Sequence, residues 1–212
     1  MKKILISLAV LSVAFGANPP ILLTKNQDGL AIEISKMPLP SGVKLENATR
    51  EDEGIIQLRV LASDPSKNSK PQAFPLRFAP ESQVGDVPCV WSKTGTCAAF
   101  IMPSYEARGD GHSRLFVAEV KVGQIELLAL PDVETLIAST RKNLANLEIE
   151  WSGGCFGWIG DDLLIVQFQG SCELATDVGG GESREVSGYA VFCVTPEKKV
   201  VIREIVSLRI QG

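Results

Sequence analysis

Apolar and polar residues alternate with a period of two along much of the chain. Leu30, Ile32 and Ile34 are separated by smaller or polar residues, and similar patterns recur over residues 56–62 and 200–210. Successive side chains of a strand point to opposite faces of the sheet, so alternation of this kind predicts strands with one buried face.

Three other segments, residues 97–102, 163–168 and 189–194, are apolar at nearly every position. Continuous apolar runs of this length predict central strands that are buried on both faces. Turn-forming sequences such as Lys93-Thr94-Gly95 and Gly160-Asp161-Asp162 separate the runs from their neighbours.

One segment has the periodicity of a helix. Apolar residues recur at three- and four-residue spacing between Pro131 and Asn146, and Asp132 lies near the expected N-terminus, where a carboxylate is favourable. We therefore expect a helix over residues 131–146.

An internal repeat organises the remaining segments. The first copy spans about residues 87–130 and the second about 148–206, and each begins with a Trp-Ser pair, Trp91-Ser92 or Trp151-Ser152. Each copy contains four potential strands around one long inner loop. The sequence therefore predicts an all-β, mainly antiparallel fold with two four-stranded meander repeats, arranged as a β-sandwich-like compact domain or as a partial propeller.

The first copy resembles a blade of the TolB-like β-propellers. The resemblance rests on Val90-Trp91-Ser92-Lys93-Thr94-Gly95 and on the later segment from Arg114 to Gly123. The turn lacks the Pro and Asp of the family, and Glu119 stands where the family usually has Asp. The resemblance implies a binding scaffold without conserved chemistry, while about 195 residues after residue 17 are too few for six such blades.

The first 17 residues have the pattern of a secretory signal peptide. Lys2 and Lys3 precede an apolar run from Ile4 to Phe15, and the small residues Gly16 and Ala17 follow it. We expect removal of residues 1–17 and export of residues 18–212 as a single β-rich domain, to the periplasm or the extracellular space. The run is too short for a membrane span, and no later segment is a transmembrane candidate.

Composition narrows the classes of partner. The chain has 21 Lys and Arg against 25 Asp and Glu, with 45% hydrophobic residues. An acidic surface without a basic cluster repels phosphate backbones, so nucleic acid is not an expected partner. The expected partner is another protein or a component of the cell envelope, and the sequence leaves the oligomeric state open.

Five cysteines in an exported protein suggest disulfides. Cys89 and Cys97 flank a predicted hairpin turn, and Cys155 and Cys172 bracket a predicted strand, so these are the two candidate pairs, with Cys193 left over. The alternative is that several are small buried apolar residues.

Motifs for catalysis or metal binding are missing from the sequence. His112 is the only histidine, no Gly-x-Ser-x-Gly segment is present, and no spacing matches a zinc or EF-hand site, so we assign no catalytic residue, metal or cofactor. We expect Trp91 and Trp151 in the core, and Trp158 is the candidate for surface binding. The leading hypothesis is an exported, non-enzymatic binding or assembly module, and the alternative is a secreted hydrolase with a carboxylate-based site.

Overall fold

The computed structural model describes residues 20–38, 54–74, 87–105, 111–141, 143–174 and 182–211. Within these residues the chain forms three four-stranded antiparallel sheets in succession. The first sheet contains β1 (Ile21–Leu22), β2 (Ala31–Pro38), β3 (Gly54–Leu61) and β4 (Gln72–Phe74), with a short 3-10 helix at Pro65–Lys67. The second sheet contains β5 (Cys89–Trp91), β6 (Cys97–Tyr105), β7 (Gly111–Lys121) and β8 (Gln124–Leu128). The third sheet contains β9 (Leu144–Ile159), β10 (Leu163–Leu174), β11 (Glu182–Val194) and β12 (Val200–Gln211).

Each sheet is a meander in which every strand pairs with the next strand of the chain. The predicted all-β, mainly antiparallel class is confirmed, and both predicted repeats form four-stranded meanders. The structure adds a third meander, the first sheet, which the sequence did not reveal as a repeat. Residues 1–17, the predicted signal peptide, lie outside the described residues.

The single α-helix of the described chain, α1 (Val133–Thr140), connects the second and third sheets. The Asp132 side chain caps its first turn by accepting a hydrogen bond from Thr135 N. The helix is shorter than the predicted range of 131–146, because Leu144 begins β9 and pairs with Leu174. The apolar side chain of Leu144 thus belongs to the third sheet and does not continue the helix.

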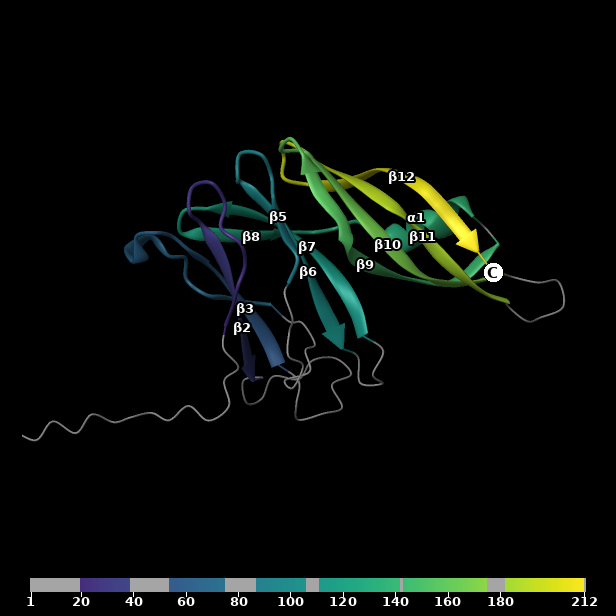
Figure 1. Ribbon diagram of the computed structural model, residues 1–212, viewed down its shortest axis with the longest axis horizontal. Coiled ribbons are helices and arrows are strands. Elements are labelled where there is room, and N and C mark those ends of the chain that lie inside the picture. Colours follow the sequence, from purple (N-terminus) through teal and green to yellow (C-terminus); the bar gives the residue numbers. More distant parts are fainter. Residues whose placement is uncertain are drawn as a thin grey trace, which may run out of the picture.

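The three sheets lie in a row, with the second between the first and the third (Figure 1). One apolar cluster joins the first and second sheets through residues such as Ile32, Leu58 and Phe100. A second cluster joins the second and third sheets through residues such as Val117 and Phe168, and α1 adds apolar side chains to it. Only the second sheet therefore packs a neighbouring sheet against each of its faces within the described residues.

The strands β9 and β10 approach so closely at Gly170 that no larger residue fits. A Cβ atom built at this position would lie 1.9 Å from the backbone oxygen of Glu148. Here glycine is required by close approach of the backbone, as it often is inside a strand.

Candidate binding surface

Two tryptophans connect successive sheets through the same kind of hydrogen bond. The Trp91 indole of the second sheet donates to the backbone oxygen of Thr24 beside the first sheet, at 2.7 Å. The Trp158 indole of the third sheet donates to the backbone oxygen of Val90 in the second sheet, at 3.2 Å. Each bond joins a sheet to the one that precedes it in the chain.

Strand register shows that Trp158, not Trp151, is the counterpart of Trp91. Trp91 pairs with Ala98, the second residue of β6, and Trp158 pairs with Leu164, the second residue of β10. The Trp-Ser alignment of the two repeats was therefore wrong. Trp151 lies farther along β9, where it is partly buried and its ring packs on the core residues Phe168 and Phe192.

Trp158 itself is half-buried and packs against the core between the second and third sheets. Its indole N–H already donates a hydrogen bond to the backbone oxygen of Val90. The geometry therefore gives Trp158 a role in joining the sheets, and a role in surface binding stays a prediction.

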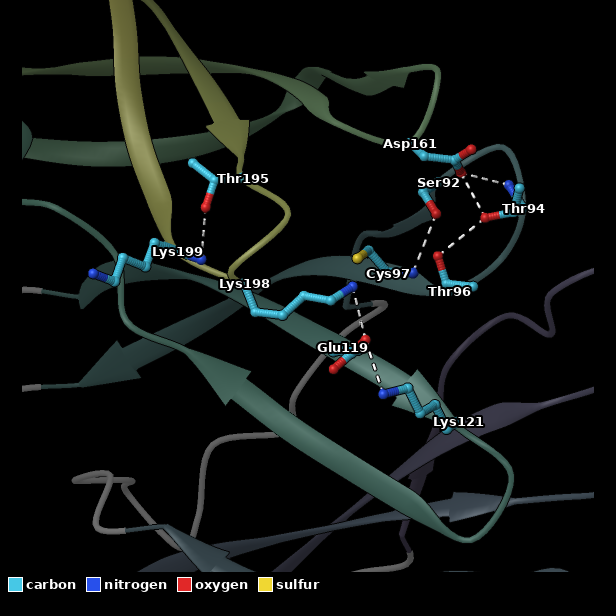
Figure 2. A network of polar contacts seen from close by, with 10 residues as sticks. All are labelled: Ser92, Thr94, Thr96, Cys97, Glu119, Lys121, Asp161, Thr195, Lys198 and Lys199. Atoms are coloured by element: carbon cyan, nitrogen blue, oxygen red, sulfur yellow. Dashed lines mark hydrogen bonds and ion pairs between the residues drawn. The ribbon is translucent and has the colours of Figure 1, made fainter.

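Polar contacts join the second and third sheets at the end that carries the first turn of each sheet, which is the β5–β6 turn in the second sheet and the β9–β10 turn in the third (Figure 2). Asp161 accepts hydrogen bonds from the backbone N and the side-chain hydroxyl of Thr94, each at 2.7 Å. The Lys93 amide donates to the backbone oxygen of Gly160 at 3.0 Å. The two hydrogen bonds from Thr94 to the Asp161 carboxylate lower the pKa of Asp161.

Glu119 forms the second polar connection in Figure 2. Its carboxylate, only 8% exposed, lies 2.8 Å from the ammonium of Lys198 in the β11–β12 turn and 3.1 Å from that of Lys121 on its own strand. The hydrogen bond from Lys198, reinforced by Lys121, lowers the pKa of Glu119, and the same contact raises the pKa of Lys198. An ion pair thus holds the two sheets together beside their apolar cluster.

All five cysteines are free, so the predicted disulfides are not formed. Cys89 pairs in register with Phe100, and Cys97 lies three residues from Phe100 on the same strand. Because side chains alternate between faces, Cys89 and Cys97 point to opposite faces of the second sheet. Burial raises the pKa of Cys89 to about 12 and also raises that of Cys97, which suits the alternative of buried apolar residues.

The second predicted pair is separated along the strands of the third sheet. Cys155 lies in an irregular segment of β9 between Ser152 and Phe156, and Phe156 pairs with Val166. Cys172 is six residues farther along β10, or about 20 Å at the usual rise per residue. A disulfide requires Cα atoms within about 7 Å, so this pair cannot be bridged without rearranging the sheet.

The candidate chemistry is sparse in the described part of the chain. His112 lies on β7 opposite Ser104, at the strand end, and its side chain is outside the description. No group of three or more His, Cys, Asp or Glu residues with metal-binding geometry occurs among the described residues. No described helix has the length and apolar character needed to cross a membrane.

An open groove of about 440 Å³ lies beside α1, between β7 and β9. Two of its acidic side chains have structural partners: Asp132 caps the helix, and Glu134 accepts a hydrogen bond from Ile149 N at 2.9 Å. The other charged side chains that line it are those of Arg114 and Glu148. The groove therefore shows no pair of carboxylates freed for acid–base catalysis.

The outer face of the third sheet, defined as the face turned away from the second sheet, carries an apolar row. Leu164 belongs to the core, so its neighbour Leu163 points outward, and directly opposed residues share its face. The row crosses all four strands next to the β9–β10 turn and consists of Ile159, Leu163, Cys193 and Val201.

Exposure is substantial along this row. Ile159 is 58% exposed and Val201 is 43% exposed, and Val206, farther along β12 on the same face, is 37% exposed. At the end remote from the β9–β10 turn the face is polar and forms a trough of about 450 Å³, lined among others by Glu148, Glu150 and Glu185. The outer face is thus apolar near the first turn of the sheet and polar at the other end.

Comparison with known proteins adds no relative. No family model matches the chain, and neither a curated protein nor a solved structure matches it.

Proposed function

We propose that the protein is an exported, non-enzymatic binding or assembly module whose binding surface is the outer face of the third sheet. The observation that carries the proposal is the exposed apolar row at Ile159 and Val201. Covering a partly exposed Val or Ile contributes about 1 kcal/mol, so several such residues in one row supply the core of an interface. The expected partner is a protein or an envelope component.

Two further observations support this proposal. The succession of four-stranded meanders is the pattern expected of propeller-like blades, which serve as binding scaffolds in the family that the sequence resembles. Export rests on the signal-like pattern of residues 1–17. A hydrolase is the weaker candidate, because Asp132 and Glu134 beside the groove are engaged in local structure.

Photo-crosslinking in the producing cell tests the binding surface. A photoreactive phenylalanine analogue replaces Val201, and a control protein carries it at Val122, which is 58% exposed in the β7–β8 turn of the second sheet. We expect a discrete adduct at Val201 and none at Val122. Equal labelling at the two positions contradicts the proposal.

Export is tested separately on the same material. N-terminal sequencing of the protein released from the periplasm or medium is expected to begin at Asn18. Retention of residues 1–17 on a protein that stays inside the cell contradicts export and leaves the binding surface to be judged by crosslinking alone.

A further inference from the structure

In the first and second sheets, one face packs against the next sheet of the chain. The corresponding face of the third sheet is the outer face. In the first sheet, Ile32 and its partner Val60 are fully buried against the second sheet. In the second sheet, Ala99 and its partner Val117 are fully buried against the third. The corresponding strand pair of the third sheet carries the outer face, which no described sheet covers.

Turn contacts repeat at the two existing junctions. Asn26 Nδ2 of the first sheet donates to the Gly95 oxygen of the second, and Lys93 N of the second donates to the Gly160 oxygen of the third, both at 3.0 Å. Gly95 and Gly160 both have positive φ, at 73° and 69°. At each junction, therefore, a turn glycine presents its carbonyl to the preceding sheet.

The first sheet has the same turn glycine. Gly29 has a φ of 76°, and its amide donates to the Asn26 oxygen as the Gly95 amide donates to the Ser92 oxygen. Its first turn is thus built to meet a preceding sheet in the way that the other two turns do. The exposed Lys25 precedes Asn26 as Trp91 precedes Ser92, which places a side-chain donor where the second sheet has its indole.

The two end faces of the row of sheets also carry most of the exposed large apolar side chains of the described chain. Leu22 pairs with Glu33 on the face of the first sheet turned away from the second, and it is 55% exposed. With Ile159, Val201 and Val206, it accounts for four of the five exposed large apolar residues of the described chain.

Both end faces also carry charged side chains. On the first sheet the Glu33–Arg59 ion pair lies in the same cross-strand row as Leu22, whereas on the third sheet the polar trough lies at the end remote from the first turn. Because first turns lie beside first turns at both existing junctions, a third junction of the same kind aligns apolar with apolar surface.

From this repetition we infer that the partner of the outer face is a second copy of this chain, whose first sheet packs on the third sheet. This inference rests on the proposed function and names its partner. The joint is head-to-tail, so the copies close into a ring if the rotation between successive copies closes, and otherwise they extend into an open chain. In either case the surface buried at the joint is the surface that now carries the exposed apolar side chains.

Sedimentation velocity of the exported protein over a range of concentrations tests the inference with three matched variants. Val201→Glu blocks the third sheet, Leu22→Glu blocks the first sheet, and Val122→Glu adds the same charge to the second sheet away from both ends. Circular dichroism confirms that each variant is folded. We expect the unmodified protein and Val122→Glu to associate, with at least a doubling of mass, and each end-blocked variant to stay monomeric.

Mixing the two end-blocked variants separates the possible arrangements. In a head-to-tail joint, the intact third sheet of Leu22→Glu meets the intact first sheet of Val201→Glu, so the mixture forms dimers although neither variant does alone. If Leu22→Glu dimerises alone, third sheets pair with each other and the inference is wrong. A monomer at all concentrations together with a Val201 adduct to a different protein also overturns the inference, but leaves the proposed function standing. If Val201 gives no specific adduct and the protein is monomeric, both fail.

Discussion

Replacing Lys198 by methionine tests how the second and third sheets are held together. The substitution removes the ammonium 2.8 Å from Glu119 but leaves Lys121 at 3.1 Å. Glu119 is 8% exposed, whereas Lys198 and Lys121 are 44% and 59% exposed, so the pair lies between the surface and buried limits. Exposed pairs contribute up to about 1 kcal/mol, and breaking a buried pair costs about 3–5 kcal/mol. Because Lys121 remains as a partner of Glu119, we expect the free energy of unfolding to fall by about 1.5 kcal/mol.

The loss should depend on pH in a defined way. The pKa of Glu119 is lowered from its usual 4.5, so the contribution of the pair is complete above pH 4.5 and disappears as the pH falls through the lower folded value. The pKa of Lys198 is raised from its usual 10.5, so the contribution is complete below pH 10.5 and disappears as the pH rises through the higher folded value. Between 4.5 and 10.5 the difference between the two proteins should be constant.

Urea unfolding followed by tryptophan fluorescence, at neutral pH and at several values below 4.5, measures this difference. Lys199→Met is the matched control, because Lys199 is exposed and its side chain points away from Glu119 in Figure 2. We expect the control to change the free energy of unfolding by less than about 0.5 kcal/mol. Equal losses for the two variants, or a loss for Lys198→Met that is unchanged in acid, refute a connection through Glu119.

Other predictions concern the junctions, the strands and the cysteines. Trp158→Phe deletes one indole–carbonyl bond and should lower the free energy of urea unfolding by about 1 kcal/mol. Gly170→Ala should cost more than about 3 kcal/mol or prevent folding, because its Cβ would lie 1.9 Å from a backbone oxygen. Gly157→Ala should change the melting temperature measured by circular dichroism little, because a Cβ atom built at Gly157 contacts nothing within 4 Å. At pH 8 a maleimide should label the exposed Cys155 quickly and Cys89, with its raised pKa, only after unfolding, as read by peptide mass. Fast labelling of Cys89 in the folded protein contradicts its burial.

Local patterns were sufficient to find the strands but not to align the repeats. Alternation and apolar runs located β2, β3, β6, β10, β11 and β12, because side-chain periodicity is a local property. The alignment of Trp91 with Trp151 failed because β9 carries an irregular segment at residues 153–155, which displaces the residues before it relative to β10. Only the register of the partner strand shows that Trp158 is the equivalent residue.

The first sheet escaped recognition for a similar reason. Its edge strands β1 and β4 contain two and three residues, too few for a periodic pattern, and β4 pairs with β3 after a 3-10 helix. The failed disulfide pairs show the same limit, because a Cys–Cys distance depends on register and on which face each side chain occupies. Among the site features, the apolar row was beyond prediction, since its four residues come from four different strands.

The sequence of β10 is more apolar than its surroundings in the single chain require, and this supports the inference that the outer face is covered in the assembled protein. Residues 97–102 have the sequence of a central strand, and β6 indeed buries both faces, with Phe100 toward the first sheet and Ala99 toward the third. Residues 163–168 have the same apolar character in β10, but only one face packs against a sheet in the described chain. A strand composed for burial on both faces, in a sheet whose outer face exposes Val201, is explained if a further sheet covers that face in the assembled protein. Val201→Glu should then abolish association while changing the free energy of unfolding of the monomer by less than about 0.5 kcal/mol, because a half-exposed side chain at an uncovered face contributes little to the stability of the single chain.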